Sequence, residues 1–401
     1  MSGAARLVAA IAVTLAVQSL TAMALAVPAV LAPVAAGDFG VAPTAVGRWV
    51  GFSYMMAMFA GLAGGTFVGR HGPARTLQVA VLGVVGGLAV GAGAHLALLL
   101  LCGALLGTAH GLVNPASSAI LAVASPPRIR SMVFSIKQTG VPLGGAIAGI
   151  LVPGLLLWMS WQEVVLALAV GAAALIAVVA PYRRVYDATR RTGRMHLRGF
   201  AAPVGEVWAN RSVLELAVVS GVYSAIQISF LTYLVSYLKL ELGYSLVAAG
   251  IVFSVAQMSG AVGRVLWGAV ADHLFKPRSV LAALGVAMAL CGAALASLSP
   301  AWSLAALLGV CAIYGATAVG WNGVFLAEVA RLAPEGRVAS LTGGTQFFTF
   351  AGVLIGPPLF GAIASLAGSY AAGFVATSAL PLLVVALIAM RPGATNERTP
   401  P

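Results

Sequence analysis

Twelve apolar stretches of about 20 residues divide the chain between Leu7 and Met390, and the short loops between them hold nearly all of its charge. A helix of about 20 residues crosses the ~30 Å hydrocarbon core of a bilayer. Lipid offers the backbone no hydrogen-bond partners, so each stretch must satisfy its own N–H and C=O groups as a helix. The pattern predicts an all-α membrane protein with spans at 7–33, 50–69, 77–95, 98–123, 132–156, 163–181, 213–237, 246–270, 279–297, 304–327, 339–365 and 370–390.

The placement of the basic residues predicts the orientation of these spans. The chain is 8% charged and 61% hydrophobic and carries a net charge of +12. If the N-terminus is cytoplasmic, 18 of the 22 basic residues fall on the cytoplasmic side, and Arg48 and Lys239 fall outside. This asymmetry follows the positive-inside rule. We expect a multi-pass protein of the bacterial inner (plasma) membrane, in contact with lipid, with cytoplasmic N- and C-termini and no nucleic-acid partner.

The chemistry-bearing residues do not suggest an enzyme. Cys102, Cys291 and Cys311 lie inside apolar stretches without disulfide or metal-ligand spacing, so we interpret them as packing residues. We expect no cofactor and no metal. The sequence has no His/Asp/Glu cluster, nucleophile elbow or phosphate loop, and no appended soluble domain that would suggest a receptor. The opening apolar run is too long for a typical signal peptide and is interpreted as an uncleaved first helix.

The longest loop divides the chain into six plus six spans. We expect an N-terminal bundle at 1–182, a cytoplasmic linker at 183–211, a C-terminal bundle at 212–391 and a cytoplasmic tail at 392–401. Seven arginines lie in the long loop. The stretch 204–214 within it forms either a short interfacial helix or simply part of the linker.

An internal repeat supports this division. Shifting the sequence by 208 superposes Gly107 on Gly315, Asn114 on Asn322, Pro126 on Pro334, Gln138 on Gln346 and Gly144 on Gly352. A shift of 203 superposes Gly65 on Gly268 and Arg75 on Arg278, and a shift of 209 superposes Gln18 on Gln227. These offsets indicate two related six-helix halves in the same orientation, an architecture of secondary transporters with a midplane site.

Two loop motifs then identify a family that the chain resembles. The loop after the second span reads Gly65-Thr-Phe-Val-Gly69-Arg70-His71-Gly72-Pro-Ala-Arg75, and the loop after the eighth reads Gly268-Ala-Val-Ala-Asp272-His273-Leu-Phe-Lys276-Pro-Arg278. Over essentially its whole length the chain is similar to the major facilitator superfamily, whose signature loop recurs at these two places. The second copy keeps the expected Asp272, whereas the first has Gly69. In the fourth span Gly103 stands where many members carry an arginine.

The resemblance implies a twelve-helix fold of two parallel pseudo-repeats and a charged latch at the inner gate. We assign Asp272, Arg278 and Glu328 to this latch, with Arg70 and Arg75 borrowing acids across the halves. The alternative is that these residues only orient the protein and solvate its loops.

Two cations lie inside spans without an acidic partner in the same span. Lys137 is about 9 Å from the inner start of the fifth span, and Arg264 is about 12 Å from the inner end of the eighth. The segment around Arg264 is similar to the eighth span of monocarboxylate and oxalate carriers, where the resemblance implies a carboxylate clamp; a guanidinium presents two parallel donors to a carboxylate. The monocarboxylate first-span motif is absent. Anion binding, pairing with the gate acids and snorkelling to the headgroups all remain open.

Further polar residues complete the predicted site. His110 is the candidate for proton coupling because histidine titrates near neutral pH, although a packed neutral histidine is equally compatible. In this family spans 1, 4, 7 and 10 line the cavity, so amides and aromatic residues there suggest substrate contacts, whereas helix packing is the alternative. The predicted substrate residues are Arg264, Lys137, Gln227, Asn322, Gln18, Tyr223, Gln138, Gln346, Asn114 and Trp321.

The sequence thus predicts a monomeric secondary carrier that moves a small organic anion, most readily a carboxylate, by alternating access. It would couple transport to a proton or another coupling ion, or to a counter-substrate. The alternative is an efflux carrier for hydrophobic or cationic compounds, a drug or metabolite exporter. The motif Gly352-Val-Leu-Ile-Gly356-Pro357 resembles an antiporter motif, but it lies in the eleventh span instead of the fifth.

Overall fold

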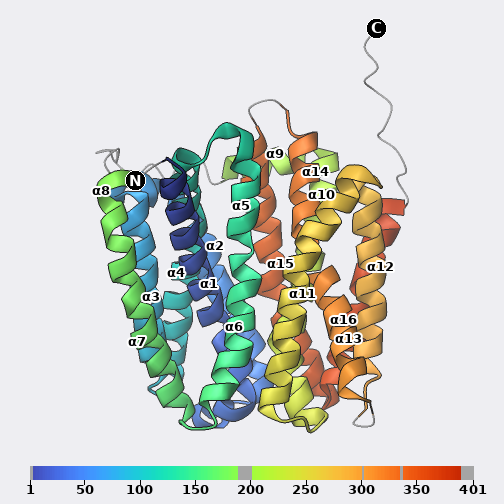
Figure 1. Ribbon diagram of the computed structural model, residues 1–401. Helices are drawn as coiled ribbons and strands as arrows, with labels where there is room; N and C mark the ends of the chain where they lie inside the picture. Colours follow the sequence, from blue (N-terminus) through green and yellow to red (C-terminus); the bar gives the residue numbers. More distant parts are fainter. Residues whose placement is uncertain (1–2, 188–200, 300–301, 335–336, 390–401) are drawn as a thin grey trace.

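The computed structural model describes residues 3–187, 201–299, 302–334 and 337–389, and every statement below concerns these residues. The described part is a bundle of helices (Figure 1). In chain order the elements are α1 (Gly3–Ala35), η1 (Ala36–Phe39), η2 (Pro43–Ala45), α2 (Val46–His71), α3 (Pro73–Gly91), α4 (Leu96–Ala124), η3 (Pro127–Ile129), α5 (Arg130–Gln138), α6 (Gly140–Leu155), α7 (Trp161–Val179), η4 (Ala180–Tyr182), α8 (Arg183–Tyr186), α9 (Ala201–Ala209), α10 (Arg211–Ser236), the π-helical turn η5 (Tyr237–Glu241), α11 (Leu246–His273), α12 (Pro277–Ala296), α13 (Leu304–Ala318), α14 (Asn322–Leu332), α15 (Val338–Ala367) and α16 (Tyr370–Ala389).

The twelve membrane spans predicted from sequence are confirmed as twelve helical segments long and apolar enough to cross a bilayer. The predicted bounds differ from the observed ones by at most seven residues, and the largest difference is at the start of the second span, predicted at residue 50 and observed at Pro43. The third span ends at Gly91 instead of residue 95, because Ala92 and Gly93 form a turn. Two spans that the sequence presented as continuous are interrupted. The fifth divides into α5 and α6 at Thr139, and the tenth into α13 and α14 at residues 319–321.

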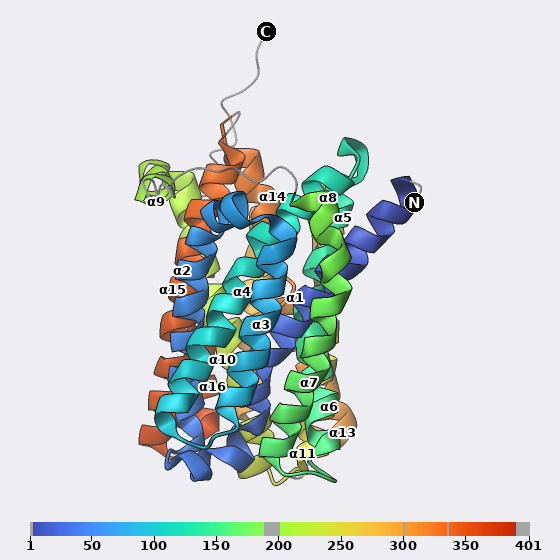
Figure 2. The ribbon, with the colours of Figure 1, turned by 90° about the vertical axis from the view of Figure 1, so that its left-hand side faces the viewer.

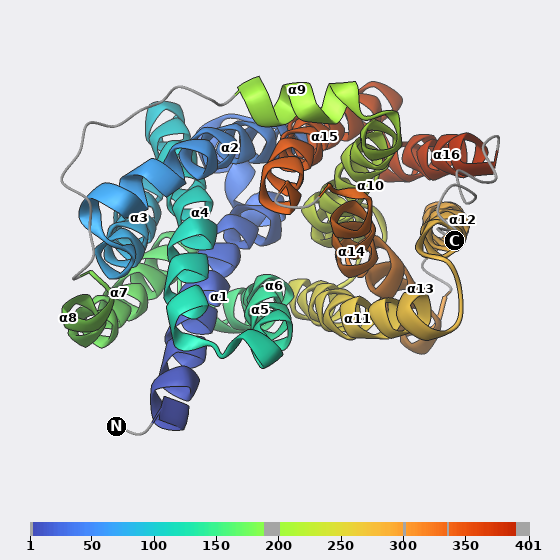
Figure 3. The same cartoon turned by 90° about the horizontal axis from the view of Figure 1, so that it is seen from above.

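The helices form two groups that meet along two seams. Helices α1–α7 lie together on one side and α10–α16 on the other (Figures 1 and 3). The groups contact one another mainly through α2 with α15 and through α6 with α11. The first described residue of α1 and the last of α16 lie at the same end of the bundle (Figure 1). We call this end, where Arg70, Arg128 and Arg331 lie, the basic face, and the other end the opposite face.

Glycine residues allow the helices to approach one another closely at both seams. A Cβ on Gly250 of α11 would lie 2.1 Å from the carbonyl oxygen of Gly149 on α6. A Cβ on Gly47 of α2 would lie 2.4 Å from the carbonyl oxygen of Pro357 on α15. Small residues allow membrane helices to approach backbone to backbone, where dispersion contacts hold them without a hydrophobic driving force. The abundance of glycine, 48 residues, therefore serves the packing between the two groups.

The segment between the two groups contains helix. Helix α9 lies across the basic face beside α15 (Figure 3), and the Pro203 carbonyl approaches Gly344 so closely that a Cβ there would be 2.2 Å away. Trp208 of α9 stays exposed. This is the helix that the sequence left open as an alternative to plain linker. Of the linker arginines, Arg190, Arg191, Arg194 and Arg198 lie outside the described residues, as does the predicted tail 392–401.

Asp187, just after α8, caps the start of α3. Its carboxylate accepts hydrogen bonds from the backbone N–H groups of Ala74 (2.8 Å) and Arg75 (3.2 Å), and the Arg75 side chain lies 4.0 Å from it. Gly72 makes room, because it adopts φ +93° and a Cβ there would lie 2.3 Å from the carboxylate. A negative charge at a helix N-terminus satisfies unpaired donors and complements the helix dipole. Arg75 thus has an acidic partner from its own side of the chain, and not the cross-half partner expected from sequence.

We predict that Asp187→Ala lowers the free energy of unfolding by about 1 kcal/mol, the usual value of a lost helix cap. The measurement is thermal unfolding of the purified protein in detergent. Asp272→Ala is the matched control, since Asp272 is the motif acid of the second half but is exposed on α11. Equal losses in the two variants would contradict the capping role.

Candidate functional site

The interruption of the fifth span follows from Pro142. In a continuous helix the N–H of residue 142 would bond the carbonyl of Gln138, but proline has no N–H. Arg264 of α11 supplies the missing donor: its Nη1 donates to the Gln138 carbonyl oxygen at 3.0 Å. A side chain from one group of helices therefore satisfies the backbone of the other.

The same guanidinium also contacts the interruption of the tenth span. Nε of Arg264 donates to the carbonyl oxygen of Val319 at 3.1 Å, where the chain turns between α13 and α14. Gly320 follows directly, and a Cβ there would lie 2.1 Å from the Ala316 carbonyl oxygen. Arg264 is half-buried and forms no ion pair within the described ranges. Its charge is met by two backbone carbonyls and no carboxylate.

Lys137 is the second buried cation and lies next to the same interruption. Its side chain is 2% exposed, and Nζ donates to Asn114 Oδ1 on α4 and to Gln138 Oε1 at 3.3 Å. Both partners are neutral amides, and no described carboxylate pairs with Lys137. Asn114 is exposed although it lies ten residues inside the end of α4. Both cations thus contact Gln138, Lys137 at its side chain and Arg264 at its backbone.

A second amide cluster surrounds the start of α14. Gln227 of α10 accepts a hydrogen bond from Trp321 Nε1 at 3.0 Å and a longer one from Asn322 Nδ2 at 3.4 Å. The structure therefore brings three of the predicted substrate residues together at the interruption of the tenth span. The first N–H groups of α14 have no partners within their helix, as at any helix start, and this end carries the positive end of the dipole.

Two buried polar groups on the N-terminal side lack partners. Gln18 on α1 is fully buried and neither atom of its amide makes a hydrogen bond with a described residue; it packs over Gly140 at the start of α6. His110 on α4 is 9% exposed, its Nδ1 is unpaired among the described atoms, and its ring meets Tyr54 edge-on at 6.0 Å. Buried polar atoms are normally hydrogen-bonded, so these two sites have unused binding capacity.

Two predicted substrate residues do not join these clusters. Tyr223 is fully buried and its hydroxyl donates to the Leu281 carbonyl oxygen on α12 at 2.6 Å, so that hydroxyl is occupied in packing α10 against α12, although its ring meets Trp321 edge-on. Gln346 on α15 is half-buried, and its side chain makes no hydrogen bond to a described residue. Helical spacing suggests Tyr223 and the internal repeat suggests Gln346, but neither pattern determines the direction in which a side chain points.

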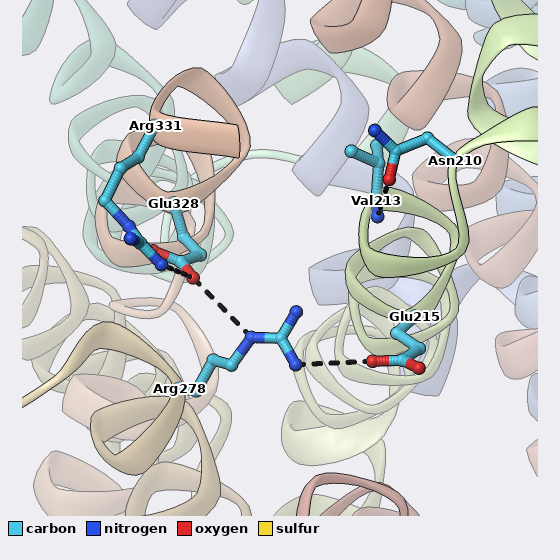
Figure 4. A network of polar contacts seen from close by, with 6 residues as sticks. All are labelled: Asn210, Val213, Glu215, Arg278, Glu328 and Arg331. Carbon is cyan, nitrogen blue, oxygen red and sulfur yellow. Dashed lines mark hydrogen bonds and ion pairs between the residues drawn. The ribbon is translucent and has the colours of Figure 1, made fainter. Parts of the chain in front are cut away.

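The charged network at the basic face is centred on Glu328 (Figure 4). Glu328 is fully buried on α14; Arg331 binds it through two hydrogen bonds of 2.7 Å, and Nε of Arg278 lies 3.6 Å away. Arg278 also contacts Glu215 of α10 at 3.3 Å. All of these residues belong to the second group of helices. Asp272 and Arg70, expected in the latch, are exposed and lie outside this network.

Sequence reasoning missed Asp187 and Glu215. A usable signal was present, because the chain has only 10 acidic residues against 22 basic ones. Each of these acids could have been examined as an arginine partner. Which arginine each acid meets depends on the packing of α3, α10 and α12, and no local pattern encodes that.

The comparisons with known proteins agree with this architecture. The family model described as Major Facilitator Superfamily matches residues 14–351. The chain belongs to the Major Facilitator Superfamily. It is 26% identical to the hexuronate transporter of Bacillus subtilis over 88% of this chain and 86% of that one. It is also 26% identical to an uncharacterised MFS-type transporter of Mycobacterium tuberculosis, over 71% of this chain but only 62% of that protein's length.

A shorter match and a solved structure complete the comparison. Monocarboxylate transporter 13 of Rattus norvegicus is 31% identical over 37% of this chain and 34% of its own. The crystal structure of a bacterial homologue of the human lysosomal transporter Spinster, inward-facing and unoccupied, superposes with a TM-score of 0.79 at 16% identity over 96% of each chain. This likeness establishes the shared fold. The family-model match confirms the major facilitator resemblance inferred from the loop motifs, and with its twelve apolar helices the protein is a multi-pass membrane protein of that superfamily.

We predict that Glu328→Gln lowers the free energy of unfolding by roughly 2 kcal/mol, because it leaves two arginines facing a neutral amide; the exposed end of Arg331 keeps this below the loss for a fully buried pair. Thermal unfolding in detergent measures it. Glu206→Gln is the control, since Glu206 pairs with Arg337 at 2.6 Å but its side chain is 26% exposed, whereas that of Glu328 is fully buried. A smaller loss at Glu328 than at Glu206 would overturn this assignment.

Proposed function

We propose that this transporter moves a small organic anion, most readily a carboxylate, with Arg264 and Lys137 as its charged contacts. The observation that carries the proposal is the pair of in-span cations whose partners are all neutral. A charge inside the membrane is costly unless it is matched, so a net positive site favours an anionic substrate. The names of two relatives, a hexuronate transporter and a monocarboxylate transporter, support the same substrate class.

The arrangement suits a carboxylate in particular. A guanidinium has five N–H donors, and Arg264 uses two of them on the carbonyls of Gln138 and Val319. Its position is therefore fixed while other donors remain for two parallel bonds to a carboxylate. Gln18, Gln227 and Asn322 would contact the remaining polar groups of the substrate, and His110 would carry a coupled proton.

We also propose that the basic face is cytoplasmic and that transport proceeds by alternating access. Toward the opposite face both seams are closed, by Gly149 against Gly250 and by Tyr233, whose hydroxyl lies 2.9 Å from the Thr44 carbonyl oxygen and 2.8 Å from that of Pro357. The similar solved structure is inward-facing, which supports the interpretation that this conformation opens to the basic face. The six-helix units at 1–182 and 212–391, joined by the linker, would then rock against one another as two bodies.

We predict that Arg264→Gln reduces carboxylate uptake by about thirty-fold or more, since truncating one partner of a buried charge contact costs at least ~2 kcal/mol. Lys137→Gln should act in the same direction. Proteoliposomes with labelled glucuronate and lactate as probes give the measurement, with Arg264→Lys testing the fork geometry and the exposed Arg211→Gln as control. If the parent protein moves neither acid, and apolar cations are exported equally by parent and Arg264→Gln, an efflux carrier replaces this proposal.

Rocking as two bodies has its own test. A leucine at Gly47 should push α2 from α15, because a Cβ there would already lie 2.4 Å from the carbonyl oxygen of Pro357 on α15. If the groups move as rigid bodies, the other seam opens too, and Ser254→Cys on α11 should react several-fold faster with a charged thiol reagent added at the opposite face. Gly309→Leu is the control, since a Cβ at Gly309 meets no atom within 4 Å. An unchanged labelling rate in folded Gly47→Leu protein rules out coupled motion of the seams.

A further inference from the structure

An apolar cavity of about 350 Å³ lies near the opposite face, within the first group of helices and away from Arg264 and Lys137. Its walls come from α1, α2, α3, α4 and α7 and include Leu31, Trp49, Leu99, Cys102, Trp161 and Val165. The indole N–H groups of both tryptophans already have acceptors: Trp49 Nε1 donates to the Leu99 carbonyl oxygen at 2.9 Å and Trp161 Nε1 to Asp38 at 2.6 Å. The walls therefore present hydrocarbon and aromatic faces to the cavity.

The second group of helices fills the corresponding place with aromatic rings. The offset of 209 that relates Gln18 to Gln227 also relates Pro28 and Val165, which line the cavity, to Tyr237 and Phe374. Those two rings are 1% exposed and pack with centroids 5.3 Å apart. The N-terminal group thus has small side chains where its repeat has large ones. Protein interiors are close-packed, so a cavity of this size and composition suggests an apolar occupant.

The exposed lining residues, which we take as the mouth of the cavity, lie at the ends of membrane spans. Among the lining residues, Arg48 is exposed, and Leu96 and Leu100 are 50% and 47% exposed. Leu96 is the first residue of α4 and Arg48 lies two residues after the start of α2, so both are at the ends of spans, where headgroups lie. Arg48 makes no hydrogen bond or ion pair to any described residue and is available to a phosphate.

We propose that this cavity binds one acyl chain of an anionic phospholipid from the surrounding bilayer, with the lipid phosphate on Arg48. The chain enters between Leu96 and the start of α2 and lies against Trp49, Cys102 and Val165. Apolar surface in the cavity is covered by hydrocarbon, and the single exposed cation at the mouth selects an anionic headgroup. This site is separate from the proposed anion pathway and does not depend on it.

The test is photolabelling of the full-length protein in nanodiscs with phosphatidylglycerol that carries a diazirine in one acyl chain, followed by peptide mapping. We expect adducts on the cavity walls, at residues 27–46, 88–102 and 161–165. Val165→Phe, which copies Phe374 of the other half, should remove most of them. Val170→Phe on the same helix is the matched control, because Val170 is 75% exposed and does not line the cavity.

A second variant tests the headgroup contact without altering the interior. Arg48→Gln should reduce the preference for phosphatidylglycerol over phosphatidylcholine by about fivefold, the size expected for one basic residue at an anionic surface. Cavity adducts that are equal in folded Val165→Phe and Val170→Phe would overturn the proposal, and so would a preference unaffected by Arg48→Gln. It would also be overturned if a photoreactive free fatty acid labelled the cavity and the phospholipid did not.

Discussion

The need of every backbone group in a lipid-embedded helix for a hydrogen-bond partner governs this structure. Where the helices are regular the requirement is met locally, and the chain needs only apolar side chains. Where Pro142 removes a donor and residues 319–321 turn, carbonyl oxygens are left without helical partners. Arg264 satisfies one carbonyl at each place. The interruptions and the buried cation therefore depend on one another, and the candidate site lies where the helical rule is broken.

The same requirement explains how much of the fold could be read from sequence. Span number and approximate bounds follow from hydrophobic length, and these predictions were confirmed. The interruptions at Thr139 and at 319–321 were missed because Pro142 and Gly320 look like ordinary kink residues until a partner helix is in place. The end of the third span was misplaced because Ala92–Ala94 is as apolar as the helix before it.

Prediction of the candidate site succeeded in residue type more than in geometry. Lys137, Asn114 and Gln138 are in contact, as are Gln227, Trp321 and Asn322. Tyr223 lies on the same helix as Gln227, but its hydroxyl is used by α12. The difference between the two residues depends on side-chain rotamers and on neighbouring side chains, and helical spacing specifies neither. Asp187 was missed for a related reason, since its partners at the start of α3 are more than a hundred residues away in sequence.

The hydrogen bond from Arg264 to Gln138 joins the two groups of helices at the α6–α11 seam. Among the described residues it is the polar contact of that seam nearest the basic face. A guanidinium that receives a carboxylate shares its donor strength with the new acceptor, and its attraction to a neutral carbonyl weakens. If the proposed carboxylate binds Arg264, we infer that it loosens one of the hydrogen bonds that hold the two groups of helices together. The substrate-free protein would then be the stiffer form, and substrate binding would favour movement of the two groups of helices relative to one another.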